Sequence, residues 1–200
     1  MDTREIDVLL LMIGVLEKLG VPYCIGGSWA SSIHGMWRAT NDADLVAAIE
    51  PKHVSILAAE LEAEFYADEQ AIARAVRAKQ SFNVIHLGTM FKVDVFVSKQ
   101  SGFDAMQLER REGKPVAADS ERFVWVASAE DTVLAKLDWY RRGNEVSDRQ
   151  WRDILNVLKV QSGRLDLTHL RHWAEELRVL DLLEEALREA EHAEGDQSAG

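Results

Sequence analysis

The chain has 200 residues, enough for one domain with a buried core or for a domain with a helical appendage. Its composition, 47% hydrophobic and 28% charged, is that of an ordinary globular protein, and no run reaches the roughly 18 to 20 apolar residues that a membrane span needs. The formal net charge of −11 argues against a protein that coats DNA or other nucleic acid through bulk electrostatics.

The negative charge is concentrated near the C-terminus. Residues 166–200 hold ten Asp or Glu and three Arg, so the first 165 residues carry a net charge of only −4. That balance leaves room for a local basic groove in the larger part of the chain. The N-terminal residues lack the basic region of a signal peptide, and the single Cys24, in an apolar run, indicates a buried structural thiol. We therefore expect a cytoplasmic protein with no membrane partner.

The first 127 residues predict alternating helices and strands. We expect helices at 2–19, 28–35, 51–63, 69–78 and 101–111, and strands at 21–27, 43–49, 82–87, 91–97 and 122–127. The strands at 82–87 and 91–97 form a hairpin around Gly88, Thr89 and Met90. In the second of them, Phe91, Val93, Val95 and Val97 lie on one face and Lys92, Asp94 and Phe96 on the other.

From Ser128 onward the pattern is helical only, with helices expected at 127–143, 148–163, 166–179 and 180–192. The predicted fold class is therefore α/β (α+β), with a small mixed β-sheet flanked by helices in residues 1–127. A helical lobe packed on it follows at 128–193, and a disordered tail at 194–200.

A strand-to-helix junction at Gly26, Gly27 and Ser28 has the residue types of a phosphate site. Glycines let the backbone approach a ligand, and the N–H groups at a helix start attract an anion, with the Ser28 hydroxyl adding a donor. The alternative is that the glycines only turn the chain. This stretch alone does not decide between the two interpretations.

Asp42 and Asp44 stand two residues apart at the start of a strand, so their carboxylates point to the same side of the expected sheet. Two like charges side by side repel unless a cation lies between them, which is the condition for a Mg²⁺ site. A solvated acidic turn is the alternative for this pair.

Asp94 lies in the middle of the apolar strand FKVDVFV, where a carboxylate is costly unless it is paired or binds a metal. If this strand lies beside that of Asp42 and Asp44, three carboxylates converge near the glycines. Such a set is sufficient for two Mg²⁺ ions and an in-line displacement at phosphorus. A salt bridge to Lys92 is the alternative, and one strand face can accommodate both.

Together these residues resemble the signature of the polymerase-β-type nucleotidyltransferase superfamily. That signature is Gly-Gly or Gly-Ser, a spacer of about a dozen residues, Asp-x-Asp, and a third carboxylate on a later strand. Here thirteen residues separate Ser28 from Asp42, and Asp94 follows. The match is closest to small prokaryotic toxin-type (abortive-infection-like) and uncharacterised families, and more distant to aminoglycoside and lincosamide nucleotidyltransferases. Ala30, His34, Gly35, Arg38 and Thr40 occupy positions of their longer motif.

The resemblance implies a role for each residue of the set. Gly27 and Ser28 would bind the β- and γ-phosphates of an NTP such as ATP, and Asp42 and Asp44 would hold the metal. Asp94 would complete the second metal site and help to deprotonate the attacking hydroxyl. The implied cofactor is Mg²⁺, as one or two ions, with Mn²⁺ as a substitute.

Two basic residues are added as nucleotide ligands. Arg38 is placed to reach a phosphate bidentately, or else to pair an acid at the surface. Lys136 lies near the buried face of its helix, and a lysine at this position is explained if its charge faces a cleft. This helical region resembles the one that follows the catalytic domain in the toxin-type families. Asp148, Arg149, Arg152 and Asp153 follow on the next helix, where capping and solvated ion pairs explain most of them. Trp139, Tyr140 and Trp151 are candidates for stacking a base or for packing in the core.

The favoured hypothesis is a Mg²⁺-dependent nucleotidyltransferase. It would move a nucleoside monophosphate from an NTP to a hydroxyl of a tRNA, a protein or a small molecule, and release pyrophosphate. A second hypothesis is a catalytically silent nucleotide-binding or regulatory module of the same fold, such as an antitoxin-like partner. A third is that the acids are structural and an unrelated ligand binds between the two lobes.

Overall fold

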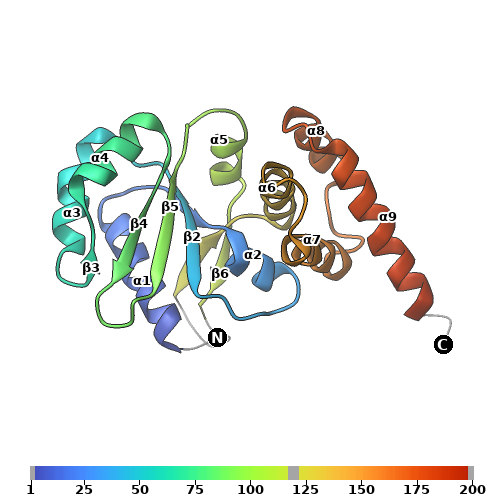
Figure 1. Cartoon of the computed structure of the whole chain (residues 1–200), viewed down its shortest axis with the longest axis horizontal. Helices are drawn as coiled ribbons and strands as arrows, with labels where there is room; N and C mark the ends of the chain where they lie inside the picture. Colours follow the sequence, from blue (N-terminus) through green and yellow to red (C-terminus); the bar gives the residue numbers. More distant parts are fainter. Residues whose placement is uncertain (1–2, 117–121, 198–200) are drawn as a thin grey trace. The chain divides into compact units, whose positions relative to one another are not determined.

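The computed structural model describes residues 3–116 and 122–197 (Figure 1). The chain divides into two compact units. The sheet unit comprises residues 1–26 and 39–127, and the helical unit comprises residues 27–38 and 128–200. One boundary between the two units falls after residue 127, where the sequence predicts that the α/β domain ends. Residues 27–38, by contrast, group with the C-terminal helices and not with the N-terminal part of the chain.

The sheet unit is built on a mixed sheet, as predicted. Its described strands are β1 (Tyr23–Ile25), β2 (Asp42–Ala47), β3 (Phe65–Tyr66), β4 (Ser81–His86), β5 (Lys92–Val97), β6 (Glu112–Pro115) and β7 (Phe123–Val126). Their order in the sheet is β3-β4-β5-β2-β1-β7-β6. Strands β2 and β5 are parallel, as are β1 and β7, and the other neighbours are antiparallel.

Helices pack against this sheet and against one another. They are α1 (Thr3–Lys18), the 3₁₀ turn η1 (Pro51–His53), α3 (Val54–Leu61), α4 (Glu69–Ala78) and α5 (Gly102–Glu109). Helix α3 packs against α1 and α4, and α4 also packs against β4 (Figure 1). The Asp68 carboxylate caps α4 by accepting hydrogen bonds from the backbone N–H groups of Gln70 and Ala71.

The predicted hairpin and its alternation are both confirmed. Strands β4 and β5 are antiparallel, with Asn83 opposite Asp94 and Val84 opposite Val93. Val93 and Val95 are fully buried, whereas the residues that alternate with them are partly exposed. Because apolar and polar residues alternate along β5, burial of the apolar residues puts the charged residues on the other face.

The helical unit consists of α2 (Gly27–His34), α6 (Ala129–Arg142), α7 (Asp148–Val160), α8 (Leu167–Glu176) and α9 (Leu180–Gln197). Side-chain oxygens cap three of these helices, because Ser128, Ser147 and Asp166 each accept a hydrogen bond from a first-turn N–H. Helix α2 packs against α6 and α7. At Gly35 the approach to α7 is so close that an added Cβ would lie 3.0 Å from the backbone nitrogen of Val157.

Helix α9 continues to Gln197, four residues past the predicted end of the helical lobe at 193. The rest of the predicted tail, residues 198–200, lies outside the described residues. Across the described ranges 3–116 and 122–197, none of the helices combines the length and the apolar character that a membrane span requires.

Candidate active site

The first cluster of predicted site residues lies in the sheet unit, on adjacent strands. Strand β2 pairs in parallel with β5, which puts Asp42 opposite Lys92 and Asp44 opposite Asp94. Residues opposite each other in a sheet point to the same face, so all four side chains share one face. The condition set by the sequence, that the strand of Asp94 lies beside that of Asp42 and Asp44, is therefore met.

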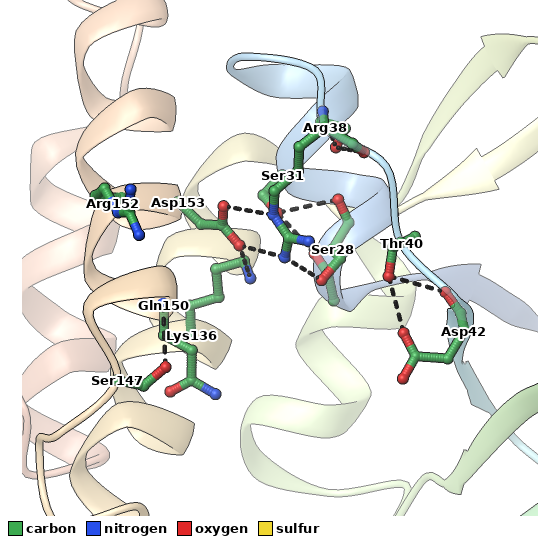
Figure 2. Close-up of polar contacts among 12 residues, drawn as sticks. Ser28, Ser31, Arg38, Thr40, Asp42, Lys136, Ser147, Gln150, Arg152 and Asp153 are labelled. Carbon is green, nitrogen blue, oxygen red and sulfur yellow. Dashed lines mark hydrogen bonds and ion pairs between the residues drawn. The ribbon is translucent and has the colours of Figure 1, made fainter. Parts of the chain in front are cut away.

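Buried neighbours hold this acidic face in place. Ala43 and Leu45 on β2, and Val93 and Val95 on β5, are fully buried and anchor the opposite face of the sheet. The carboxylates are only partly exposed, with side-chain exposures of 43% for Asp42 and 21% for Asp94. The Thr40 hydroxyl donates a hydrogen bond of 2.8 Å to Oδ1 of Asp42 and fixes that carboxylate (Figure 2).

Lys92 contacts the acids directly. Its Nζ lies 2.6 Å from Oδ2 of Asp94 and 4.0 Å from Oδ2 of Asp42. The hydrogen bond to Asp94 raises the pKa of Lys92, partial burial opposes this, and the charges of Asp94, Asp42 and Asp44 raise it further. The salt bridge considered as the alternative role of Asp94 is thus present, and the same strand face carries the acid pair as well.

The donor set suits a magnesium ion, although the side chains would have to move to bind one. Among the residues that the structure describes, no three His, Cys, Asp or Glu side chains stand close enough together to hold a metal. The three carboxylates nevertheless project from one face of two neighbouring strands, and Mg²⁺ prefers such hard oxygen ligands. Rotation of the aspartate side chains and withdrawal of Lys92 would bring the oxygens together.

Gly26 lies directly before α2, and Gly27 is the first residue of that helix. The backbone N–H of Gly26 donates a 2.9 Å hydrogen bond to the carbonyl of Asp44, which fixes Gly26 against the acidic strand. Gly27, the next residue, has a φ of +54°, a left-handed conformation that favours glycine. Gly27 therefore has a backbone conformation that glycine favours, and the binding of phosphate by Gly27 and Ser28 stays a prediction.

The second cluster lies in the helical unit and centres on Asp153 (Figure 2). Arg38 binds Asp153 in a bidentate manner, with Nε 2.9 Å from Oδ1 and Nη2 2.8 Å from Oδ2. Lys136 Nζ lies 2.9 Å from the same Oδ2, and Arg38 Nη2 also donates to the Ser28 hydroxyl at 2.5 Å. Three of the four predicted nucleotide ligands, Ser28, Arg38 and Lys136, therefore belong to one connected cluster.

The second cluster places two cationic side chains and one carboxylate beside the Ser28 hydroxyl. The side chains of Asp153 and Lys136 are only 7% and 9% exposed, and that of Arg38 is 24% exposed. Two cationic groups next to a hydroxyl are chemically suited to an anion.

Asp153 remains ionised because of its two partners. Burial alone would raise the pKa of Asp153, but the hydrogen bond from Arg38 and the charge and hydrogen bond of Lys136 hold it below its ordinary value. The sequence indicated Asp153 only as part of a charged helix start. The signal that could have singled it out is its place beside Ile154 and Leu155 on the apolar face of α7.

Two of the three aromatic candidates pack against each other, and the third is exposed. Tyr140 and Trp151 pack against each other with ring centroids 5.2 Å apart, and Trp151 Nε1 donates a 2.8 Å hydrogen bond to Glu189. Trp139 is 47% exposed, with the Arg142 guanidinium over its ring. Tyr140 and Trp151 are therefore half-buried and pack against each other, outside the fully buried core.

No protein-family model matches the chain, and no curated protein matches it either. Several solved structures do match the chain. The solution structure of the antibiotic-resistance factor ANT(2'')-Ia superposes with a TM-score of 0.56 at 14% identity, over 97% of this chain and 100% of that one. Its crystal structure in complex with adenylyl-2''-tobramycin gives a TM-score of 0.59 at 12% identity, over 88% and 98%.

Two further structures match at a similar level. The lincosamide antibiotic adenylyltransferase LnuA, solved with lincomycin, gives a TM-score of 0.52 at 14% identity, over 80% of this chain and 98% of that one. A nucleotidyltransferase-like protein from Paracoccidioides brasiliensis gives 0.52 at 16% identity, over 94% of both chains. The chain therefore has the nucleotidyltransferase fold. The closer likeness to toxin-type families stays a prediction.

Proposed function

We propose that the chain is a Mg²⁺-dependent nucleotidyltransferase that moves a nucleoside monophosphate from an NTP to a hydroxyl acceptor. The observation that carries this proposal is the register of β2 and β5, which aligns Asp44 with Asp94 and leaves Asp42 two residues away on the same face. The nucleotidyltransferase fold supports it independently.

Asp42, Asp44 and Asp94 would hold one or two Mg²⁺ ions, or Mn²⁺ in their place. The bound ion would neutralise charge on the phosphates. The protein's own part is to present three oxygen-donor side chains from a rigid pair of strands, whose opposite face is anchored by fully buried residues.

The reaction that fits these residues is a displacement at the α-phosphorus. The acceptor hydroxyl oxygen forms a bond to that phosphorus, the bond from the phosphorus to the oxygen bridging to the β-phosphate breaks, and pyrophosphate leaves. Asp94 accepts the proton of the hydroxyl. The resemblance to the superfamily assigns this role to Asp94, which lies opposite Asp44 on the neighbouring strand.

The triphosphate would be bound by residues of the helical unit. Ser28, Arg38 and Lys136 supply a hydroxyl and two cations, and the N-terminal N–H groups of α2 follow Gly27. Asp153 would orient both cations through its three contacts.

The acceptor is a hydroxyl of a tRNA, a protein or a small molecule. Tobramycin and lincomycin, which appear in the structures of the neighbours, are the first small molecules to try. The experiment is a screen of each α-³²P-labelled NTP with Mg²⁺ against total RNA, total protein and these two antibiotics. Label transferred to one acceptor class supports the proposal, and a screen without any transfer argues against turnover.

The silent nucleotide-binding module is the second candidate function. The contact that favours it is the 2.6 Å ion pair between Lys92 and Asp94, because a proton acceptor bound to an ammonium group is a poor base. Calorimetry with each NTP and Mg²⁺, followed by a pyrophosphate assay in cell extract, separates the two candidates. Tight binding without pyrophosphate release would favour the silent module.

A further inference from the structure

Among the described residues, Lys92 faces more acids than the other lysines of the sheet unit that form ion pairs. Lys114 contacts Glu112 at 2.6 Å, Lys52 contacts Glu50 at 3.1 Å, and Lys18 contacts Glu60. Lys92 lies 2.6 Å from Asp94 and 4.0 Å from Asp42, and Asp44 also contributes to its charge environment. The three acids that surround Lys92 are the three proposed metal ligands.

The strand register explains why Lys92 occupies this position. Lys92 lies directly opposite Asp42 and two residues before Asp94, so its side chain leaves the sheet on the acidic face. Three carboxylates on one face repel one another unless a cation lies among them. The Lys92 ammonium, at 41% side-chain exposure, brings a positive charge to this face and contacts Asp94 and Asp42.

We propose that Lys92 is a tethered countercharge: it neutralises the acidic face in the metal-free protein and competes with the divalent cation for the same carboxylates. This inference rests on the proposed assignment of Asp42, Asp44 and Asp94 as metal ligands. A lysine suits the role because its charge is a compact ammonium on a flexible four-carbon stem, which can withdraw toward solvent without moving the strand.

Two consequences follow from this competition. Removing the charge of Lys92 should strengthen metal binding, because the ion no longer has to displace an ammonium group. It should also destabilise the metal-free protein, because the acidic face then loses the ammonium group that contacts Asp94 and Asp42. If Lys92 formed only a surface salt bridge, its removal would leave the affinity for metal unchanged and would lower stability by no more than the small amount expected for any exposed pair.

The test uses the full-length protein and Mn²⁺ alone, without nucleotide. Lys92→Met keeps most of the side-chain length and removes the charge, and Lys92→Arg keeps the charge. Lys114→Met is a matched control, because it also removes a strand lysine that pairs with an acid two residues away. Calorimetry gives the Kd of Mn²⁺, and thermal unfolding gives the Tm of each metal-free protein.

We expect Lys92→Met to lower the Kd of Mn²⁺ by about five- to tenfold relative to wild type, because a unit charge roughly 4 Å from another changes an affinity by about that factor even in a largely solvated site. Its metal-free Tm should fall below that of Lys114→Met, and added Mn²⁺ should reverse that difference. Lys92→Arg and Lys114→Met should bind Mn²⁺ about as wild type does.

Equal Kd values for Lys92→Met and Lys114→Met would overturn the inference, as would weaker binding by Lys92→Met. Asp42→Asn separates this failure from a failure of the proposed function. If Asp42→Asn abolishes Mn²⁺ binding while Lys92→Met leaves it unchanged, the metal assignment stands and the role of Lys92 does not. If wild type and Lys92→Met both bind no Mn²⁺, the metal assignment and the inference fail together.

Discussion

Asp44 and Asp94 lie opposite each other on adjacent parallel strands, although fifty residues separate them in the chain. Such a pair of half-buried carboxylates is unfavourable in a sheet unless a cation accompanies it. In the structure that cation is Lys92. The proposed function assigns the same place to a metal ion when the nucleotide is bound.

We expect Ser28→Ala to raise the KM for the NTP about three- to tenfold and to leave kcat nearly unchanged, because one hydrogen-bond donor to the triphosphate is lost. The matched control is Ser31→Ala on the same helix. The Ser31 hydroxyl donates to the backbone carbonyls of Gly27 and Ser28, whereas the Ser28 hydroxyl accepts a hydrogen bond from Arg38. An equal increase in KM for both variants would mean that the effect comes from the helix and not from the phosphate contact.

Asp153→Asn should destabilise the protein by about 2 to 3 kcal/mol, because Arg38 and Lys136 then lose the largely buried carboxylate that they share. It should also raise the KM for the NTP, since neither cation is held in position. Asp148→Asn, at the exposed start of the same helix, is the control. Chemical unfolding and steady-state kinetics measure the two effects, and equal behaviour of the two variants would contradict the role of Asp153.

The stability of the protein should fall more steeply in acid for wild type than for Asp153→Asn. The pKa of Asp153 is below its ordinary value in the folded protein, because the contacts with Arg38 and Lys136 outweigh the effect of burial. In the unfolded chain it returns to about 4. The ion pairs therefore contribute fully above that value, and their contribution is lost as the pH falls through the lowered folded pKa.

Urea unfolding at steps between about pH 6 and about pH 3 measures this difference. Wild type and variant share every other titrating carboxylate, so the gap between their unfolding free energies isolates Asp153. The gap should narrow as the solution becomes more acidic. A constant gap over this range would show that the pKa of Asp153 is not lowered by folding.

Gly35→Ala should destabilise the helical unit by about 1 to 3 kcal/mol, because the added Cβ would lie 2.9 Å from the carbonyl oxygen of Ser31 and 3.0 Å from the backbone nitrogen of Val157. Gly14→Ala is the control, since its Cβ would have no neighbour nearer than 4.0 Å. In the middle of α1 that change should be neutral or stabilising by up to about 1 kcal/mol. Thermal unfolding distinguishes the two, and a neutral Gly35→Ala would contradict the close packing of α2 on α7.

The sequence was sufficient to predict the elements with strong periodicity. Helices α1, α4 and α6 to α9 follow their apolar spacing and caps, and the parity of β5 put Asp94 on the correct face. Strand β3 has two residues, and β6 is the polar stretch Glu112–Pro115. Neither was predicted, because a strand this short or this polar depends on its neighbours in the sheet and not on its own pattern.

The two clusters differ in how far the sequence could define them. The acidic face depends on strand alternation and on a single pairing of β2 with β5, and alternation is visible in the sequence. The contact between Arg38 and Asp153 joins residues 115 positions apart, on segments with unrelated patterns. Only the packing of α2 against α7 brings them together, so Asp153 was indicated as no more than part of a helix start.

The central claim is tested most directly by nucleotidyl transfer from α-³²P-labelled NTPs in the presence of Mg²⁺. Wild type should label one acceptor class and release pyrophosphate. Asp42→Asn and Asp44→Asn should each lose transfer by about a thousandfold or more while remaining folded, because each removes a charge that the proposed metal site requires. Full transfer activity in both variants would contradict the account.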